Sequence, residues 1–359
     1  MNRLAPSITP YKQFAEILAA LDSAKDQARA WTGNGFRLAA VSHAGASKIL
    51  SGRGSQEFGG RWNASGAFPA VYCSLLPETA VTETMSRFRK TGLKARRPLP
   101  GVLVSLTIRL QSVLDFTNPR EFSAIAPFLA KAKRENWQKL QDEGREASSQ
   151  AIGRGAHQLG IEGILFSSAV AAGATNLVVF PDNLRARSVL RIENEAVLRK
   201  YVHEKVHERL HSSEIAVCSD RTFMATAALT KRRLQQRASK PLRIEKPSAP
   251  GSGSIAVKQL RLLLKLPRPI FARLMGCSER ALANWETGWP IQDIYKSRLN
   301  ELRKLYDELA EVTEPESIGA WFTAPNEEFG GMKPVELIER GEIFRIWRLV
   351  FFLKSGTPT

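Results

Sequence analysis

The chain has 359 residues, enough for two or three domains, and a hydrophobic content of 43% that supports buried cores. It has no run of 18 apolar residues and no signal-peptide core at its amino terminus, so we expect a cytoplasmic protein with no membrane span. The three cysteines, Cys73, Cys218 and Cys277, argue against a disulfide framework, while the net charge of +17 favours nucleic acid as a partner over a merely soluble basic protein.

The first predicted element is a helix over residues 11–31, in which Phe14, Ile17, Leu18, Leu21 and Ala24 share one face. This pattern predicts packing and no chemistry. A second helix is expected over 42–50, ending at Gly52.

Residues 58–83 combine a glycine-rich loop, a short strand and the start of a helix. The glycines of the loop permit positive φ, the apolar run 70–74 is long enough for one strand, and Pro77 opens a helix that carries Glu83. Because these segments follow one another closely, Arg61, Tyr72 and Glu83 are expected in one region. A cation, an aromatic ring with a polar tip and a carboxylate suit a phosphorylated ligand with a planar, charged ring.

Further along, residues 101–110 alternate and are rich in β-branched side chains, which predicts a strand. Residues 121–151 have a polar helical pattern, and residues 161–166 and 177–180 read as short buried strands.

Several motifs in this part of the chain occur in the order found in the RES domain of bacterial toxin–antitoxin systems, which these residues resemble over residues 30–190. The motifs are Phe36-Arg37, Gly59-Gly60-Arg61-Trp62-Asn63, Tyr72, Glu83, Ser167-Ser168-Ala169-Val170, Asn176 and Phe180-Pro181. RES toxins resemble ADP-ribosyltransferases and consume NAD. The resemblance therefore implies an α+β, ADP-ribosyltransferase-like fold that takes NAD+ as its substrate. No metal is expected.

The same resemblance implies roles for individual residues. Arg37, Tyr72 and Glu83 would be catalytic, with Glu83 stabilising positive charge on the ribose. NAD+ would be bound by Arg37, Arg61, Asn63, Tyr72, Ser168 and Asn176. Taken singly, each arginine can equally form a structural ion pair. Water, phosphate and a protein side chain all remain open as the acceptor.

The next segment raises two alternatives. His203, His207 and His211 recur at four-residue spacing on one predicted helix, which fits either a metal site or, with the Glu and Lys neighbours, a solvated helix. Residues 231–254 are basic and end in Pro, Ser and Gly, which predicts a flexible linker.

Residues 255–288 predict a helix-turn-helix resembling Xre-type repressors, the alternative being an ordinary helical hairpin. Ser278 is placed as the N-cap of the second helix, whose Leu282 and Trp285 face the core. Arg280 and Asn284 then project outward, where they can read guanine and adenine. Arg268 stands where the family has a glutamine that touches phosphate. We expect Arg268, Ser278, Arg280 and Asn284 to contact operator DNA.

The last predicted helices resemble the toxin-binding domain of Xre antitoxins that partner RES toxins. The resemblance covers residues 300–359 and rests on Pro334, Leu337, Gly341 and an apolar helix over 344–353. That helix is expected either to dock on a RES domain, with the tail 354–359 reaching toward the NAD pocket, or to complete its own core. The docking can occur within one chain or between the two chains of a dimer. The leucines of helix 296–312 (Leu299, Leu302, Leu305 and Leu309) suggest either a homodimer seam or packing within the domain.

The predicted organisation is a RES toxin domain (1–200), a helix with a basic linker (201–254), an all-α helix-turn-helix domain (255–298) and a toxin-binding domain (299–359). The predicted function is a toxin–antitoxin fusion that cleaves NAD+, is neutralised by its own C-terminal domain and binds operator DNA as a homodimer. The alternative is a repressor whose toxin-like part only binds ligands.

Overall fold

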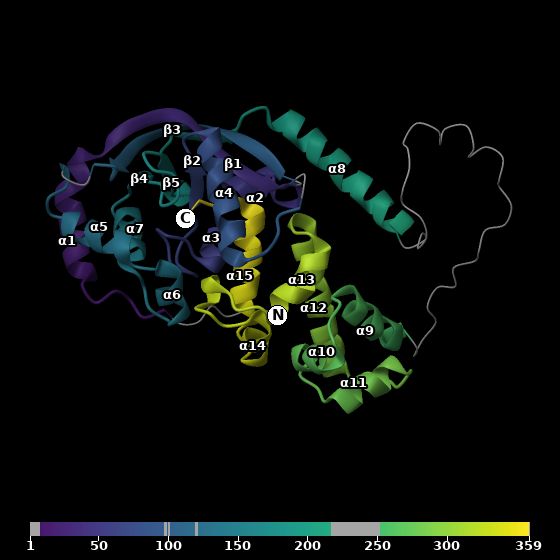
Figure 1. Cartoon of the computed structure of the whole chain (residues 1–359). Coiled ribbons are helices and arrows are strands. Elements are labelled where there is room, and N and C mark those ends of the chain that lie inside the picture. The colour runs from purple at the N-terminus through teal and green to yellow at the C-terminus, as the bar shows by residue number, and fades with distance from the viewer. Residues whose placement is uncertain (1–7, 97–98, 100, 119–120, 217–251, 359) are drawn as a thin grey trace, which may run out of the picture.

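The computed structural model describes residues 8–96, 99, 101–118, 121–216 and 252–358 (Figure 1). A mixed β-sheet with surrounding helices forms the first part, and a cluster of helices forms the second. This order of a sheet-containing part and a helical part is the one expected from the sequence. The stretch 217–251, which contains most of the predicted linker, lies outside the described residues.

The first part contains six strands. They are β1 (Arg29–Ala40), β2 (Val71–Ser74), β3 (Gly101–Asp115), β4 (Gly163–Ser167), β5 (Thr175–Val179) and β6 (Val189–Ile192). Its helices are α1 (Phe14–Ala24), α2 (Ala46–Leu50), α3 (Arg53–Phe58), α4 (Pro77–Thr91), α5 (Ala126–Arg134), α6 (Trp137–Asp142), α7 (Ser148–Gln158) and α8 (Glu195–Ala216), with short 3-10 turns η1 (Lys25–Gln27), η2 (Val41–His43) and η4 (Pro181–Asn183).

The sheet curls back on itself. Its strand order is β1-β2-β5-β4-β3-β6, and β1 pairs along most of its length with β3 as well as meeting β2 at Phe36 and Ser74. All pairings are antiparallel except β3 with β4. Side chains that alternate along a strand therefore face two separate cores. On β2, Val71 and Cys73 face one core and Tyr72 faces the other.

Three helix predictions need correction. The helix predicted over 42–50 is the 3-10 turn η2 followed by the short helix α2. The helix predicted over 11–31 ends earlier, because η1 closes α1 and β1 begins at Arg29 to pair with β3. The helical stretch 121–151 is three helices. Asn136 interrupts it by capping α6, where its side chain accepts from the Lys139 amide, and Gly144 turns the chain at a φ of 70°.

The second part contains the helices α9 (Ser252–Leu263), α10 (Arg268–Met275), α11 (Glu279–Glu286), α12 (Asp293–Val312), α13 (Pro315–Thr323), α14 (Pro334–Glu339) and α15 (Ile343–Ser355), with the 3-10 turn η5 (Glu327–Phe329). Figure 1 shows α15 lying beside α3 and α4, at the border between the two parts. The end of the chain lies within the first part, close to β1 and α4, as contacts described below establish.

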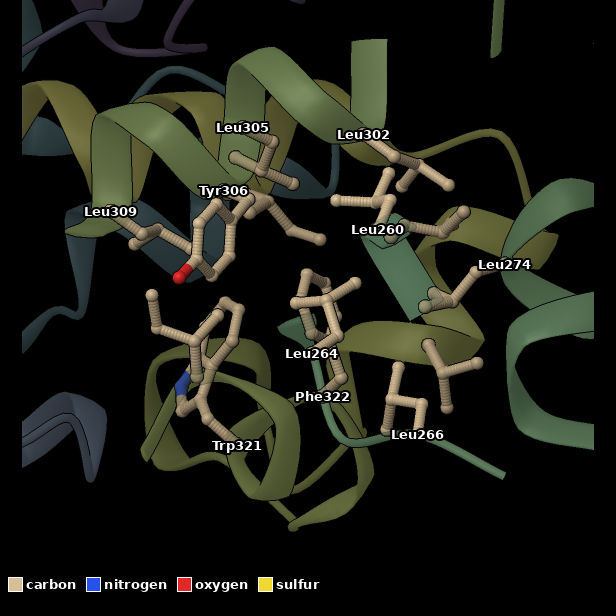
Figure 2. Packing of buried hydrophobic residues seen from close by; sticks show 14 of the residues in the cluster. Leu260, Leu264, Leu266, Leu274, Leu302, Leu305, Tyr306, Leu309, Trp321 and Phe322 are labelled. Carbon is tan, nitrogen blue, oxygen red and sulfur yellow. The ribbon is translucent and has the colours of Figure 1, made fainter. Parts of the chain in front are cut away.

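One hydrophobic cluster holds the helices of the second part together. Figure 2 shows Leu302, Leu305 and Leu309 of α12 pointing toward residues of α9 and α13. Leu299, Leu302, Leu305 and Leu309 are all buried within this chain, so they pack intramolecularly and leave no leucine seam for a partner. Phe88 and Leu93 join the same cluster. The core of the helical part therefore continues onto the end of α4.

Candidate functional site

Helix α4 positions the carboxylate that the sequence singled out. Pro77 starts the helix, and the helical repeat turns Glu83 inward, where it is 4% exposed. Its Oε1 accepts hydrogen bonds from Ser168 Oγ at 2.7 Å and Asn176 Nδ2 at 2.8 Å. Three residues from separate motifs, one on α4, one after β4 and one on β5, thus meet at one oxygen. Two donors on a buried carboxylate fix its direction.

Tyr72 fixes the glycine-rich loop that precedes β2 through hydrogen bonds of its hydroxyl. The Tyr72 hydroxyl donates to Asn63 Oδ1 at 2.7 Å and accepts from the Trp62 amide at 2.9 Å. Asn63 Nδ2 donates in turn to the carbonyls of Ser55 and Phe68. A Cβ on Gly60 would lie 2.5 Å from the Tyr72 hydroxyl, so only glycine allows this contact. Asn63 and Tyr72, which the sequence predicts to bind NAD+, are both buried. Their hydrogen bonds fix the shape of the loop.

Burial also raises the pKa of Tyr72 well above its usual value. The phenol therefore stays neutral at physiological pH, which suits its double role as donor and acceptor.

The loop delivers Arg61 to the same region as Glu83. The Arg61 guanidinium carbon lies 5.6 Å from the ring centre of Phe166 and 5.8 Å from that of Trp62. Burial lowers the pKa of Arg61, and the nearby Glu83 acts in the opposite direction. Arg61 is therefore a half-buried cation that faces the carboxylate across the site.

Arg61 and Glu83 line one pocket, of about 340 Å³, which is the low end of the range for small-molecule sites. Its wall continues along α4 through Ser86, Arg87 and Lys90. Six residues from the end of α5 to the start of α6 also line it, as do Glu327 and Glu328 of the helical part; the six are Ala132, Lys133, Glu135, Asn136, Trp137 and Gln138. Sequence reasoning missed Arg87, although its position four residues after Glu83 places both on one helix face. No local signal pointed to residues 132–138 or to the two glutamates.

Arg37 is not part of this pocket wall. It lies on β1, is 4% exposed, and donates to the Ile49 carbonyl at 3.2 Å. Its Nη2 donates to the Ser355 carbonyl at 2.8 Å and to the Thr357 hydroxyl at 3.0 Å. Burial lowers the pKa of Arg37 to about 10, which leaves it charged at neutral pH.

The C-terminal tail links Arg37 with the pocket. Arg87 donates to the Thr357 carbonyl at 3.4 Å, so the tail contacts one arginine on β1 and one on α4. Gly356 lies between them with a φ of 63°, and a Cβ there would lie 2.0 Å from the Leu38 carbonyl oxygen. The tail is therefore seated as closely as backbone contact permits.

Helix α15 brings the tail to this position through buried contacts. Asp142 of α6 forms ion pairs with Arg345 at 2.8 Å and Arg348 at 2.6 Å, and all three side chains are at most 9% exposed. Phe351 stacks on Phe58, with ring centres 5.1 Å apart. Helix α15 thus both completes the core of the helical part and docks on the first part.

The residues expected at DNA lie on α10 and α11. Ser278 accepts from the Ala281 amide at 3.2 Å and caps α11, while Leu282 and Trp285 are buried as expected. Arg280 is exposed and Asn284 is half-buried. Arg268 is half-exposed and donates to Glu286 at 2.8 Å, which fixes it beside the end of α11.

Within the described part of the chain, no three His, Cys, Asp or Glu side chains gather in a way that could hold a metal ion. Of the three histidines on α8, only the side chain of His203 belongs to that part. None of the helices in the described ranges is long and apolar enough to cross a membrane.

Comparison with known proteins matches residues 36–199 to the RES domain. The chain is 29% identical over 140 residues to the NAD(+) phosphorylase MbcT of Mycobacterium tuberculosis, covering 38% of this chain and 69% of MbcT. It is 32% identical over 84 residues to the Mycobacterial cidal antitoxin MbcA of the same organism, covering 23% of this chain and 74% of MbcA.

Among solved structures, the M. tuberculosis MbcT–MbcA toxin–antitoxin complex is similar, with a TM-score of 0.38 and 23% identity over 52% of this chain and 96% of that one. The chain belongs to the RES-type toxin–antitoxin proteins, with a RES domain at residues 36–199 and homology to both the toxin MbcT and the antitoxin MbcA.

Proposed function

We propose that the RES domain cleaves NAD+ at the bond between nicotinamide and ribose, and that the helical part inhibits it within the same chain. The observation that carries this proposal is the Glu83 carboxylate, held by Ser168 and Asn176 in a pocket that it shares with Arg61. A buried, oriented carboxylate is what a developing ribosyl cation needs. The arginines supply forked donors for the pyrophosphate.

In this reaction the bond from the ribose carbon to the nicotinamide nitrogen breaks, and its electron pair leaves with neutral nicotinamide. The positive charge that builds on the ribose lies beside Glu83. An acceptor oxygen then forms the new bond and gives up its proton, if it carries one, to solvent. The relative MbcT is an NAD(+) phosphorylase by name, which favours phosphate as that acceptor over water or a protein side chain.

Inhibition is proposed to come from the tail. Arg37 would bind the substrate pyrophosphate, yet its guanidinium already donates to Ser355 and Thr357. Residues 299–359 would then act as the antitoxin domain and residues 1–200 as the toxin domain, joined through residues 201–298. This arrangement makes the chain a toxin fused to its antitoxin.

We further propose that residues 255–298 are a helix-turn-helix that binds operator DNA for autoregulation. The supporting observation is the placement of α10 and α11 around a positive-φ turn at Gly276, with Arg280 exposed on the second helix. Binding to a palindromic operator would require a homodimer, and the α12 leucines do not supply its interface because they are buried within the chain.

The test is nicotinamide release by a fragment of residues 1–200 and by the full chain. We expect release from the fragment only, with circular dichroism to show that the fragment is folded. A folded fragment that releases no nicotinamide at substrate saturation would leave the alternative, a DNA-binding repressor with a non-catalytic ligand module.

A further inference from the structure

Helix α4 carries a second charged residue toward the pocket, one turn after Glu83. Arg87 is 5% exposed, and its Nη1 forms no hydrogen bond with any described residue. Among the described residues, its Nη2 donates to the Thr357 carbonyl at 3.4 Å. A buried guanidinium N–H without an acceptor destabilises the fold, and an acceptor on a bound ligand would remove this penalty. The Nη1 donor is therefore available to a ligand of the pocket.

Within the first part of the chain, the pocket wall carries four cations, Arg61, Arg87, Lys90 and Lys133, and two carboxylates, Glu83 and Glu135, so its balance of charge is positive. Lys90 follows it on α4, Lys133 faces the same pocket from the end of α5, and Arg61 lies on the glycine loop. Clustered cations around a cavity of this size attract an anion, and a guanidinium favours phosphate oxygens because its donors form a fork.

The helical part places two carboxylates at this same position. Glu327 and Glu328 line the pocket. Nearby, Asn326 Nδ2 and Trp321 Nε1 both donate to the Thr91 carbonyl at the end of α4, at 2.8 and 2.9 Å. Burial lowers the pKa of Arg87, and Glu328 is the first of the charges that act against this. The turn therefore places negative charge beside Arg87.

We propose that Arg87 and Lys90 form a phosphate-binding subsite of the RES domain, and that the neighbouring carboxylates of Glu327 and Glu328 repel the substrate anion from it. This inference rests on the proposed function and names two residues that the reaction would use in addition to Arg37 and Arg61. The ligand chemistry is a phosphate group, supplied either by the pyrophosphate of the dinucleotide or by free inorganic phosphate.

A purely structural role for Arg87 explains less. Its guanidinium carbon lies 4.4 Å from the ring centre of Phe352, which accounts for one face of the group. That contact does not use the Nη1 donor, and it gives no reason for the exposed Lys90 or for two carboxylates on the facing turn.

The experiment is calorimetric titration of the full chain with inorganic pyrophosphate. Glu327→Gln/Glu328→Gln is expected to bind it about tenfold more tightly than the unchanged chain, because two repelling charges are removed. Glu316→Gln, on the exposed side of α13, is the matched control and should leave the affinity unchanged. Adding Arg87→Met to the double variant should abolish this increase in affinity for pyrophosphate. Equal affinity in the double variant, or a gain that survives Arg87→Met, overturns the proposal.

Lys90→Met gives a second, exposed test position should Arg87→Met fail to fold, and it should lower the gain severalfold. Competition identifies the source of the phosphate group. Displacement of pyrophosphate by ADP-ribose assigns the subsite to the dinucleotide, whereas simultaneous binding of ADP-ribose and inorganic phosphate assigns it to free phosphate. Nicotinamide release by the 1–200 fragment is measured separately. If the fragment releases nicotinamide but the double variant does not bind pyrophosphate, only the subsite is contradicted. If the double variant binds pyrophosphate but the fragment releases no nicotinamide, only the proposed reaction is contradicted.

Discussion

The guanidinium of Arg37 donates to the carbonyl of Ser355, which lies 318 positions further along the chain, at 2.8 Å. A residue proposed to hold the substrate pyrophosphate is thereby occupied by the backbone of the residue that ends α15. Because the acceptors are a carbonyl and a hydroxyl rather than a carboxylate, the tail replaces an anion with neutral oxygens. Such a contact can be displaced without leaving an uncompensated negative charge behind.

The first prediction concerns Gly356→Val in the full chain. The new side chain would meet the Leu38 carbonyl at 2.0 Å in a backbone conformation that disfavours it, so the tail should leave Arg37. We expect nicotinamide release to rise from the background to at least a tenth of the rate of the 1–200 fragment. Gly276→Val is the control, since it has a similar φ of 69° with no atom near its Cβ. A Gly356→Val protein whose tail has left Arg37 but which still releases no nicotinamide would contradict inhibition by the tail.

Removing all of residues 342–359 is a poorer test, because Ile346 and Leu349 belong to the core of the helical part.

The second prediction is that Glu83→Gln nearly abolishes turnover by the 1–200 fragment. The amide can still accept from Ser168 and Asn176, so the fold should be kept, but the negative charge is lost. The expected decrease in kcat is on the order of 100- to 1000-fold, or about 3 to 4 kcal/mol in the barrier. Steady-state nicotinamide release measures it, with the exposed Glu121→Gln as control. A folded Glu83→Gln fragment with near-normal kcat rules out this role.

The third prediction concerns docking of α15. Asp142→Asn leaves Arg345 and Arg348 buried without their shared carboxylate. Breaking a buried pair in this way costs about 3 to 5 kcal/mol, which should appear as lower stability towards urea and as partial release of activity. Asp307→Asn breaks a pair with Arg303 in which both partners are about half exposed, and it should change stability by less than about 1 kcal/mol. Equal losses in the two variants would show that Asp142 does not hold the two parts together.

The fourth prediction is a pH dependence from His43. Burial, then Lys354 and Lys48, lower the pKa of His43 to about 3, while Glu311 acts in the opposite direction and Arg37 adds a smaller lowering effect. The unfolded chain takes up a proton near pH 6.5, and the folded chain does not until about pH 3. Stability from this residue is therefore full above pH 6.5 and falls as the pH is lowered toward 3, by up to about 1.4 kcal/mol per pH unit.

Urea unfolding of the full chain at pH 7.5 and pH 5 measures this effect. His43→Asn should reduce the difference between the two pH values, because asparagine does not titrate. An unchanged difference would assign the pH dependence to other groups.

The fifth prediction concerns DNA. Arg280→Ala and Asn284→Ala on α11 should weaken binding to the operator by about 1 to 3 kcal/mol each and binding to random duplex much less. Arg303→Ala on α12, also exposed, is the matched loss of charge. Fluorescence anisotropy with both duplexes measures the two affinities. Equal losses on operator and random DNA would refute base reading by α11.

The sequence by itself determined the placement of residues whose structural neighbours are close along the chain. Glycines before a short strand, followed by Pro77 and a helix, are enough to bring Arg61, Tyr72 and Glu83 near one another, because strand and helix repeats are set locally. The same holds for the Ser278 cap and for the buried Leu282 and Trp285 on α11. Local periodicity also showed that the leucines of α12 form one face, yet it could not say what covers that face.

Only the tertiary structure decided what lies opposite each of these faces. It turned Asn63 and Tyr72 toward the loop, placed Arg87 beside the pocket, and buried the α12 leucines against α9 and α13. It also brought Ser355 to Arg37 and Glu328 to the wall that holds Arg87. The physical reason is that a side chain's direction follows from its own backbone repeat, whereas its partner follows from how distant segments pack, and packing depends on the whole chain at once.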